Sequence, residues 1–381
     1  MVVGTGNKRM RSSRCEGIGL CSAVYKEQPD LLSASEKRSN SMEISKYFAM
    51  DAEKIGTGAY NPLSGFMDEN EIDSVLTFNH LPNGEAWTMP IFLHAESEQY
   101  FKDGDEIFLK YRGETFARMR VESIFEPDVH RIASKLYLTE EESHPGVRQL
   151  LSFKGKFLSG KVFLLKRLES LGGDPTPEDV KKYFREQGWK TIAGYQTRNP
   201  PHMAHEYIQR IALEIMDGLF INPVVGELKP GDFNENSIME SYRYLVDNYY
   251  PHDHVLIRPL HVAMRYAGPK AAAFFALIRR NYGCTHFLVG RDMAGVGKYY
   301  PPYAAHELLS SLDLGINIVP FKEIYYCKKC GTMVSERSCR HGMPEEDALS
   351  MSGIRDMLRA GKHPPDTVMR RDIVDILVRG A

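Results

Sequence analysis

The sequence predicts a β-rich domain, then an α/β domain with a parallel sheet, and last a small region built around a metal site. Short apolar runs broken by turn residues extend to about residue 165. Strand and helix patterns alternate from about residue 190 to 290, which is typical of a parallel sheet. Three cysteines and a histidine then cluster between residues 327 and 341. At 381 residues, the chain has room for two or three domains.

The first domain is expected to span residues 44–181, after a poorly ordered or irregular leader at residues 1–43. Its strands are expected at residues 87–93, 106–111, 117–124 and 162–165, where apolar runs are bounded by Gly, Pro, Asn and Asp. Helices are expected near residues 68–76 and 138–150.

The second domain is expected at residues 182–322. Strands are predicted at 191–194, 219–225, 255–260 and 286–289, with helices at 202–216, 235–248 and 269–282. Right-handed crossovers would make this sheet parallel, and ligands of such sheets bind beyond the carboxyl ends of the strands. The loops that start at Gln196 and Gly290 should therefore meet in space. A third part, residues 323–381, should hold the Cys/His cluster and helices near 354–360 and 371–378.

Composition excludes several classes of function. The formal net charge of -2 argues against a nucleic-acid partner held by broad phosphate neutralisation. No run of about 18 apolar residues occurs, so no membrane span is expected. The basic N-terminus lacks the apolar core of a secretory signal, and the six cysteines are too few for a disulfide scaffold. We therefore expect a cytoplasmic protein.

Residues 196–206 concentrate anion-binding chemistry. Amide and cationic donors surround a turn that enters a helix, and they are Gln196, Arg198, Asn199, His202 and His205. Asn199 is expected to cap the helix with Pro200 in its first turn, and the two histidines, three residues apart, should share one face. Surface histidines beside an ordinary helix start are the alternative, which the joint occurrence of these donors disfavours. A phosphate or sulfate is expected at the helix N-terminus.

Two further loops are candidates for phosphate contacts. Residues 290–297, GRDMAGVG, follow a strand, and their glycines allow close backbone approach beside Arg291. A plain turn is the alternative, and the spacing fits neither a dinucleotide nor a P-loop motif. Residues 264–270 enter a helix with two cations, of which Arg265 is the candidate; a solvated helix N-terminus is the alternative.

The C-terminal cluster predicts a structural zinc site. Three thiols and one imidazole complete a tetrahedral shell with no open position, and they are Cys327, Cys330, Cys339 and His341. A redox C-x-x-C pair is the rival, but that motif normally opens a helix.

These segments resemble the ATP sulfurylase family over about residues 51–377. The resemblance rests on QTRNPPHMAH at 196–205, GRDMAGVG at 290–297, MRYAGP at 264–269 and GAYNPLSGFM at 58–67. It implies a PUA-like β-rich domain, a Rossmann-like nucleotidyltransferase domain and a zinc-bearing subdomain of the prokaryotic type. It also implies a homodimer or higher homo-oligomer, and no fused kinase domain, since no Walker A motif occurs.

The resemblance implies that ATP and sulfate give adenosine 5'-phosphosulfate and pyrophosphate, with Mg²⁺ carried on the nucleotide. Sulfate is already deprotonated, so alignment and charge stabilisation suffice and no covalent intermediate is needed. Carried over by position, the catalytic residues are Thr197, Arg198 and Asn199. The sulfate contacts are Gln196, Arg198 and the backbone of Ala294. The ATP contacts are Gln196, Asn199, His202, His205, Gly290, Arg291 and Asp292. Further phosphate contacts are Arg265, Ser352 and Arg355.

The chain departs from the family pattern at Met293, where a histidine is usual, and at Met351, in a glycine position. Lys270 and Ala271 replace the usual Arg-Glu, and no role is assigned there. Two other functions stay open. One is adenylyl transfer to a different acceptor, such as an organic phosphate. The other is a non-catalytic RNA-binding module, which the balanced charge disfavours.

Overall fold

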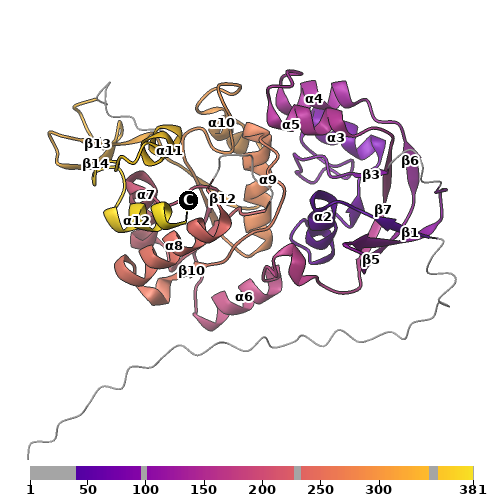
Figure 1. Cartoon of the computed structure of the whole chain (residues 1–381), viewed down its shortest axis with the longest axis horizontal. Coiled ribbons are helices and arrows are strands. Elements are labelled where there is room, and N and C mark those ends of the chain that lie inside the picture. The colour runs from indigo at the N-terminus through magenta and orange to yellow at the C-terminus, as the bar shows by residue number, and fades with distance from the viewer. Residues whose placement is uncertain (1–39, 96–100, 227–232, 343–350, 381) are drawn as a thin grey trace, which may run out of the picture. The chain divides into compact units, whose positions relative to one another are not determined.

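The computed structural model describes residues 40–95, 101–226, 233–342 and 351–380 (Figure 1). Most of the expected leader lies outside these residues. Its last part does not, because Ser41–Glu43 forms strand β1, which pairs in parallel with β4. The prediction that the leader extends to residue 43 is therefore wrong at this end, where three residues extend a sheet.

The first sheet is built around the long strand β7, Lys156–Leu164, and its main path runs β1-β4-β5-β7-β2. β3 and β6 also pair with β7. The other strands are β2 (Gly65–Phe66), β3 (Leu93–Ala95), β4 (Glu106–Tyr111), β5 (Glu114–Arg120) and β6 (Ser123–Phe125). The helices of this part are α2 (Lys46–Gly56), α3 (Glu69–Phe78), α4 (Val129–Tyr137) and α5 (Pro145–Ser152). α3 starts at a capping box, in which Asp68 accepts from the Glu71 N–H at 2.8 Å.

Two predictions for this part are largely wrong. Residues 87–92 are buried without forming a strand; the Trp87 ring N–H donates to the Met89 carbonyl at 2.6 Å. Residues 138–144 are not helical, because α4 ends at Tyr137, the next residue Leu138 has a left-handed φ of 58°, and α5 begins only at Pro145. Apolar content predicted the burial of residues 87–92 but not their backbone conformation, whereas residues 138–143 are largely exposed.

The second sheet is entirely parallel, as predicted, with the order β10-β9-β8-β11-β12. Its strands are β8 (Ile192–Thr197), β9 (Gly218–Pro223), β10 (Val255–Ile257), β11 (His286–Val289) and β12 (Asn317–Pro320). The connecting helices are α7 (Met203–Ile215), α8 (Glu235–Tyr249), α9 (Gly268–Asn281) and α10 (Ala304–Ser311). β12 and α10 extend the alternation beyond the predicted elements.

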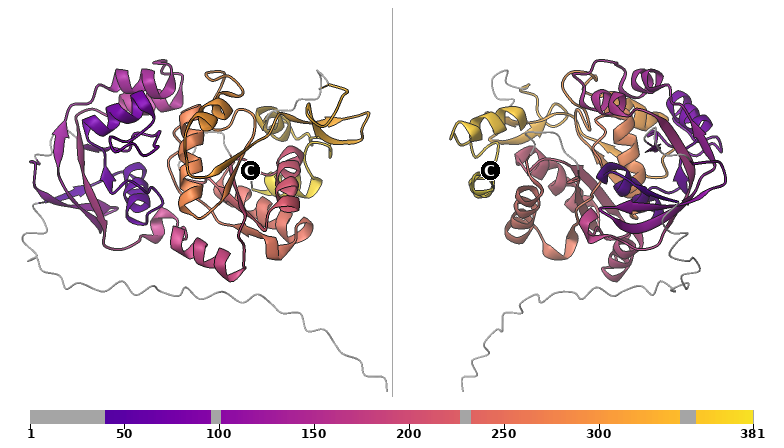
Figure 2. Two further views of the ribbon diagram at one scale, coloured as in Figure 1. Left: turned by 180° about the vertical axis from the view of Figure 1, so that it is seen from behind. Right: turned by 45° about the vertical axis from the view of Figure 1, so that its right-hand side comes forward.

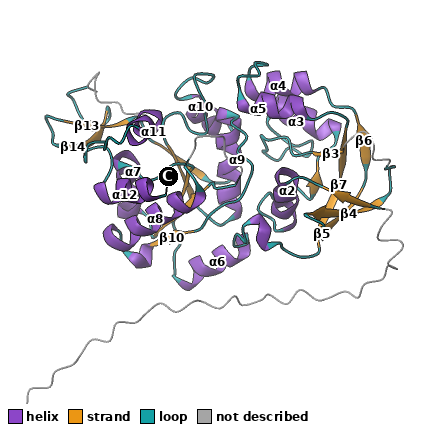
Figure 3. Cartoon of the chain, in the orientation of Figure 1, coloured by secondary structure: helices purple, strands orange, loops and turns teal. Residues whose placement is uncertain are grey.

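Alternate residues of these strands enter two different cores. Tyr195 and Ile221 pack with α7 and α8, whereas Ile192, Phe220 and Phe287 belong to the core that contains α9. Helices therefore cover both faces of the sheet (Figures 2 and 3). Phe274 of α9 also contacts the rings of Tyr60 and Trp87, at 5.1 and 5.5 Å, so α9 is buried on both sides.

Helix α6, Pro177–Glu186, runs across the domain edge expected at residue 181. The C-terminal part contains the hairpin β13 (Ile324–Cys327) and β14 (Thr332–Ser335), then α11 (Met351–Arg359) and α12 (Arg371–Arg379). α12 packs on α8 with its apolar face, which includes Ile373 and Leu377. Within the described ranges, no helix combines the length and apolar character needed to cross a bilayer.

Candidate active site

The candidate site lies where the strand order of the parallel sheet reverses. β8 leads to β9 and β10 on one side, whereas β11, its other neighbour, leads to β12. At such a switch point, the loops after two adjacent strands leave in opposite directions and open a crevice at the carboxyl edge. These loops are residues 198–202 after β8 and 290–297 after β11, the two segments that the sequence predicted to meet.

The β8 strand continues through Gln196 and Thr197, which pair with Asn222 and Pro223 of β9. The Thr197 hydroxyl accepts the Asn199 N–H at 3.1 Å and tightens the turn that follows. α7 starts at Met203 with His202 at the N-cap, so the prediction that Asn199 caps this helix is wrong. The two prolines hold the chain extended for longer than expected.

The C-terminal segment anchors the first turn of α7. The Met203 N–H donates to the Val368 carbonyl at 2.9 Å. Arg370 binds Glu206 through two parallel bonds of 2.7 and 2.8 Å and stacks on Tyr249 at 3.9 Å. The helix start is thereby fixed from outside its own sequence.

His202 and His205 lie together, as their spacing predicted. Their rings stack with centroids 3.6 Å apart. Burial lowers the pKa of His202 to about 4, and burial together with the nearby His202 lowers the pKa of His205 well below its usual value. Both rings are therefore neutral near pH 7, whereas the sequence suggested cationic donors. A neutral imidazole still donates one hydrogen bond to an anion.

Arg198 joins the two loops, which confirms that they meet. Its guanidinium donates to the Gly295 carbonyl at 3.2 Å and lies over the Tyr266 ring at 5.1 Å. Tyr266 belongs to the MRYAGP segment, so all three sequence motifs converge on this one side chain.

The glycine-rich loop contains several residues with left-handed backbone. φ is 52° at Asp292, 58° at Ala294 and 58° at Gly297. Backbone of this kind turns N–H groups toward a common point and suits anion binding. Burial raises the pKa of Asp292, although Arg291 and Arg198 oppose this shift. Arg291 forms an ion pair with Glu323 at 3.2 Å.

The structure does not bring Arg265 to these loops. Its side chain is buried, pairs with Asp51 of α2 at 2.5 Å and lies over Tyr47 at 4.5 Å. Burial lowers the pKa of Arg265 to about 9, which leaves it charged at neutral pH. The arginine therefore holds α2, and the prediction that it contacts phosphate is not supported by this placement.

Arg355 is half-buried on α11. The Ser352 side chain lies outside the described residues, so both of these assignments stay predictions.

The sequence reasoning missed several residues that organise the site. His306 of α10 bonds to the Gly290 carbonyl at 3.1 Å, and Arg370 and Glu206 fix α7. Tyr266 was within a motif but received no role. No spacing signal marks these long-range partners, since each pair is separated by 16 to 164 residues.

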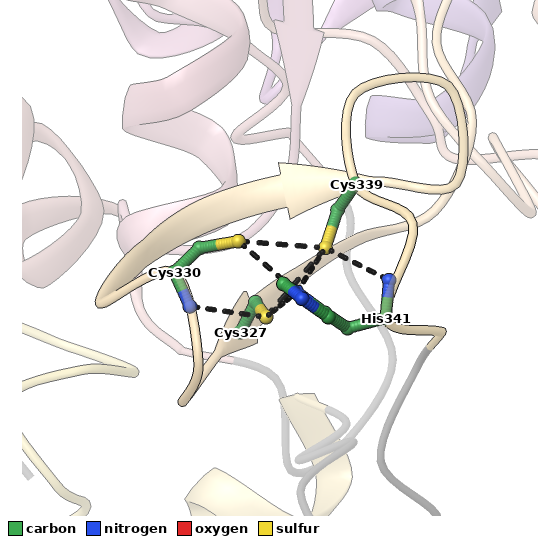
Figure 4. A group of neighbouring side chains, drawn as sticks. All are labelled: Cys327, Cys330, Cys339 and His341. Carbon is green, nitrogen blue, oxygen red and sulfur yellow. Dashed lines mark hydrogen bonds between the residues drawn. The ribbon is translucent and has the colours of Figure 1, made fainter.

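The four predicted metal ligands converge in the hairpin region (Figure 4). Their ligand atoms all lie within 4.8 Å of one another. Two sulfur pairs are 3.6 Å apart, and the sulfurs lie 3.3 to 3.5 Å from Nδ1 of His341. A tetrahedral zinc ion requires edges of about 3.8 Å between sulfurs and about 3.6 Å between sulfur and nitrogen. Backbone N–H groups of Cys330 and His341 donate to Cys327 and Cys339 sulfurs at 3.4 Å. The donor set and spacing fit zinc.

Taken together, fold and site define a nucleotide-binding α/β protein preceded by a β-rich domain. Family comparison makes this specific, because the model described as ATP-sulfurylase matches residues 174–380 and that of a PUA-like domain matches residues 14–167. The chain belongs to the ATP sulfurylase family.

Sequence relatives cover most of the chain. A sulfate adenylyltransferase from Hyperthermus butylicus is 42% identical over 87% of this chain and 86% of its own length. One from Pyrococcus abyssi is 40% identical, with coverage of 86% and 87%. A solved structure described as a hexameric APS kinase from Thiobacillus denitrificans matches with a TM-score of 0.67 and 19% identity. That match covers 90% of this chain but only 63% of the other, and it supports the fold alone.

Proposed function

We propose that this chain is a sulfate adenylyltransferase, a nucleotidyltransferase of sulfate activation. A sulfate oxygen attacks the α-phosphorus of ATP, the new S–O–P bridge forms, and the bond to the β-phosphate oxygen breaks. The products are adenosine 5'-phosphosulfate and pyrophosphate. The observation that carries the proposal is the convergence of all three anion-binding motifs on Arg198 at the switch point of the sheet.

The chemistry requires positive groups and alignment rather than a base. Two anions repel each other, and this repulsion grows as water leaves the site, so fixed donors must offset it. Arg198, with Gln196 and the Ala294 N–H, would hold the sulfate. Thr197 and Asn199 would contact the α-phosphoryl group as charge develops there. Sulfate needs no deprotonation, so no general base is required, and because its oxygen attacks the α-phosphorus directly, no protein nucleophile takes part.

The departing pyrophosphate would lie at the N-terminus of α7. The helix dipole favours negative charge there, and His202 and His205 would each donate one hydrogen bond. Arg291, Gly290 and Asp292 would border the nucleotide from the other loop.

Mg²⁺ would enter on the phosphates of ATP and neutralise part of their charge. In the described ranges, the one cluster of three or more His, Cys, Asp or Glu ligands is the thiolate-rich site, whose soft donors suit zinc and not magnesium. Zinc there would have a structural role. We further propose a cytoplasmic homo-oligomer, with a catalytic part at residues 182–322 and a zinc-bearing subdomain at 323–381.

The test measures sulfate-dependent pyrophosphate release from ATP by the full chain, together with ATP formation in reverse. Arg198→Ala should lower the sulfate-dependent kcat/KM at least about tenfold, equivalent to about 1.4 kcal/mol. Arg198→Lys should recover little, because lysine lacks the planar fork. The matched control is Arg185→Ala, an exposed arginine on α6 that pairs with Glu178, and it should keep wild-type kinetics. Unchanged kinetics in Arg198→Ala would refute the assigned role. If pyrophosphate is released from ATP with an organic phosphate but not with sulfate, the result would favour adenylyl transfer to that other acceptor.

A further inference from the structure

The Tyr266 carbonyl is held by two donors from different parts of the chain. Nε2 of His144 lies 3.2 Å from this oxygen, and the Tyr300 hydroxyl donates to it at 3.0 Å. All three side chains are buried, with His144 0% exposed. Because Nδ1 of His144 accepts the N–H groups of Gly146 and Val147 at 3.1 and 3.3 Å, the ring proton must be on Nε2. The histidine therefore donates to Tyr266 while it caps α5.

Tyr266 has a backbone conformation that needs such support. Its φ is 56°, a left-handed value that a bulky residue rarely adopts. Gly268, two residues on, has φ of 50°, and a Cβ there would lie 2.6 Å from the Tyr300 ring. The turn is thus closed by Tyr300 on one side and by His144 on the other. This turn places the Tyr266 ring beneath the guanidinium of Arg198.

We propose that His144 and Tyr300 are positioning residues, which fix the Tyr266 ring as the platform that orients Arg198 toward sulfate. The inference rests on the proposed sulfate contact of Arg198. His144 comes from the PUA-like part of the chain, which matches the family model at residues 14–167. That part thereby contributes to sulfate affinity without touching substrate.

The chain allows the donor to be removed without loss of the helix cap. Asparagine is a good N-cap residue but too short to reach the Tyr266 carbonyl, so His144→Asn separates the two roles. Tyr300→Phe removes the second donor and keeps the ring. The matched control is Tyr299→Phe, whose hydroxyl contacts Ser143 at 2.6 Å and Glu141 at 3.1 Å.

The first readout is steady-state kinetics. We expect His144→Asn and Tyr300→Phe each to raise the KM for sulfate about fivefold, the effect of a weakened cation–π contact, with kcat and the KM for ATP nearly unchanged. Tyr299→Phe should match the wild type. A role in stability alone would instead lower the melting temperature and leave the KM for sulfate unchanged, and this result would overturn the proposal.

The second readout does not depend on activity. In an NMR spectrum of arginine Nε–Hε groups, the Arg198 signal is identified by its loss in Arg198→Lys. It should lie upfield in the wild type because of the Tyr266 ring current. Tyr266→Phe should keep this shift, whereas Tyr266→Leu and the double variant His144→Asn/Tyr300→Phe should abolish it. If the shift survives in the double variant, the positioning role is wrong. If the wild type makes no pyrophosphate with sulfate, the proposed function fails, while the NMR result still decides whether His144 and Tyr300 hold the platform.

Discussion

Replacing His202 with glutamine should change how the stability of this protein depends on pH. Burial lowers the pKa of His202 to about 4 in the folded chain, against an ordinary value of 6.5. The unfolded chain therefore binds a proton below about pH 6.5 that the folded chain does not bind until about pH 4. Acid favours the unfolded state through this residue, so its effect is absent well above pH 6.5 and grows as the pH falls toward 4.

The magnitude follows from the two pKa values. At pH 5.5, the unfolded state gains about 1.4 kcal/mol from protonation of His202, and the full shift corresponds to about 3 kcal/mol. The second figure is a ceiling, because the ring is only half-buried. The stacked His205 ring, 3.6 Å away, has its own pKa lowered further, so it does not relieve this cost by taking the proton.

Urea unfolding of the wild type and His202→Gln at about pH 7.5 and 5.5 measures this contribution. Between these pH values, the wild type should lose about 1 kcal/mol more of its free energy of unfolding than the variant. Asn199→Ala is the control from the same loop and should keep the wild-type pH dependence, since it removes no titrating group. Equal losses in the wild type and His202→Gln would show that the ring is not buried as described.

Two other predictions concern the stability of the fold. Chelation of metal should lower the melting temperature of the full chain, because the closed Cys/His site stabilises only the folded state; metal analysis that finds no zinc in the purified protein would contradict this. Asp174→Asn should cost about 2 kcal/mol of unfolding free energy, since it removes the carboxylate that lies 2.9 Å from Lys54 and 2.5 Å from His261 and leaves these cations with only Glu53 and Glu235 as partners. Burial alone would raise the pKa of Asp174, but the charges and hydrogen bonds of Lys54 and His261 outweigh burial and lower this pKa to about 2. The stabilisation by the carboxylate is therefore complete above about pH 4 and is lost as the pH falls toward 2. Glu178→Gln, at an exposed ion pair, is the control and should cost less than about 1 kcal/mol; a similar small loss in Asp174→Asn would refute the argument.

The parallel sheet was predictable because its signals are local. Each strand is a short apolar run next to an amphipathic helix, and β11 was placed at its observed bounds, His286–Val289. Once the alternation is recognised, the meeting of the Gln196 and Gly290 loops follows from the topology of parallel sheets. The Cys/His site was predictable for the same reason, since its spacing alone brings four ligands together.

Features that depend on distant partners were not predictable. Residues 87–92 are apolar because Trp87 packs on Phe274 of α9, not because they pair with a strand. Arg265 looked like a phosphate ligand in its loop, but a carboxylate 214 residues away binds it. The neutral state of His202 results from burial, which the sequence pattern does not report.

The anchoring of α7 by residues 368 and 370 has a consequence for biosynthesis. While the chain is still emerging from the ribosome, the strands and both loops of the catalytic part are present before the segment that anchors the histidine-bearing helix turn. Copies that end before residue 368 would therefore lack the contacts that order the start of α7, where we propose that pyrophosphate binds. The ordered helix start would be acquired only after residues 368–370 have been synthesised.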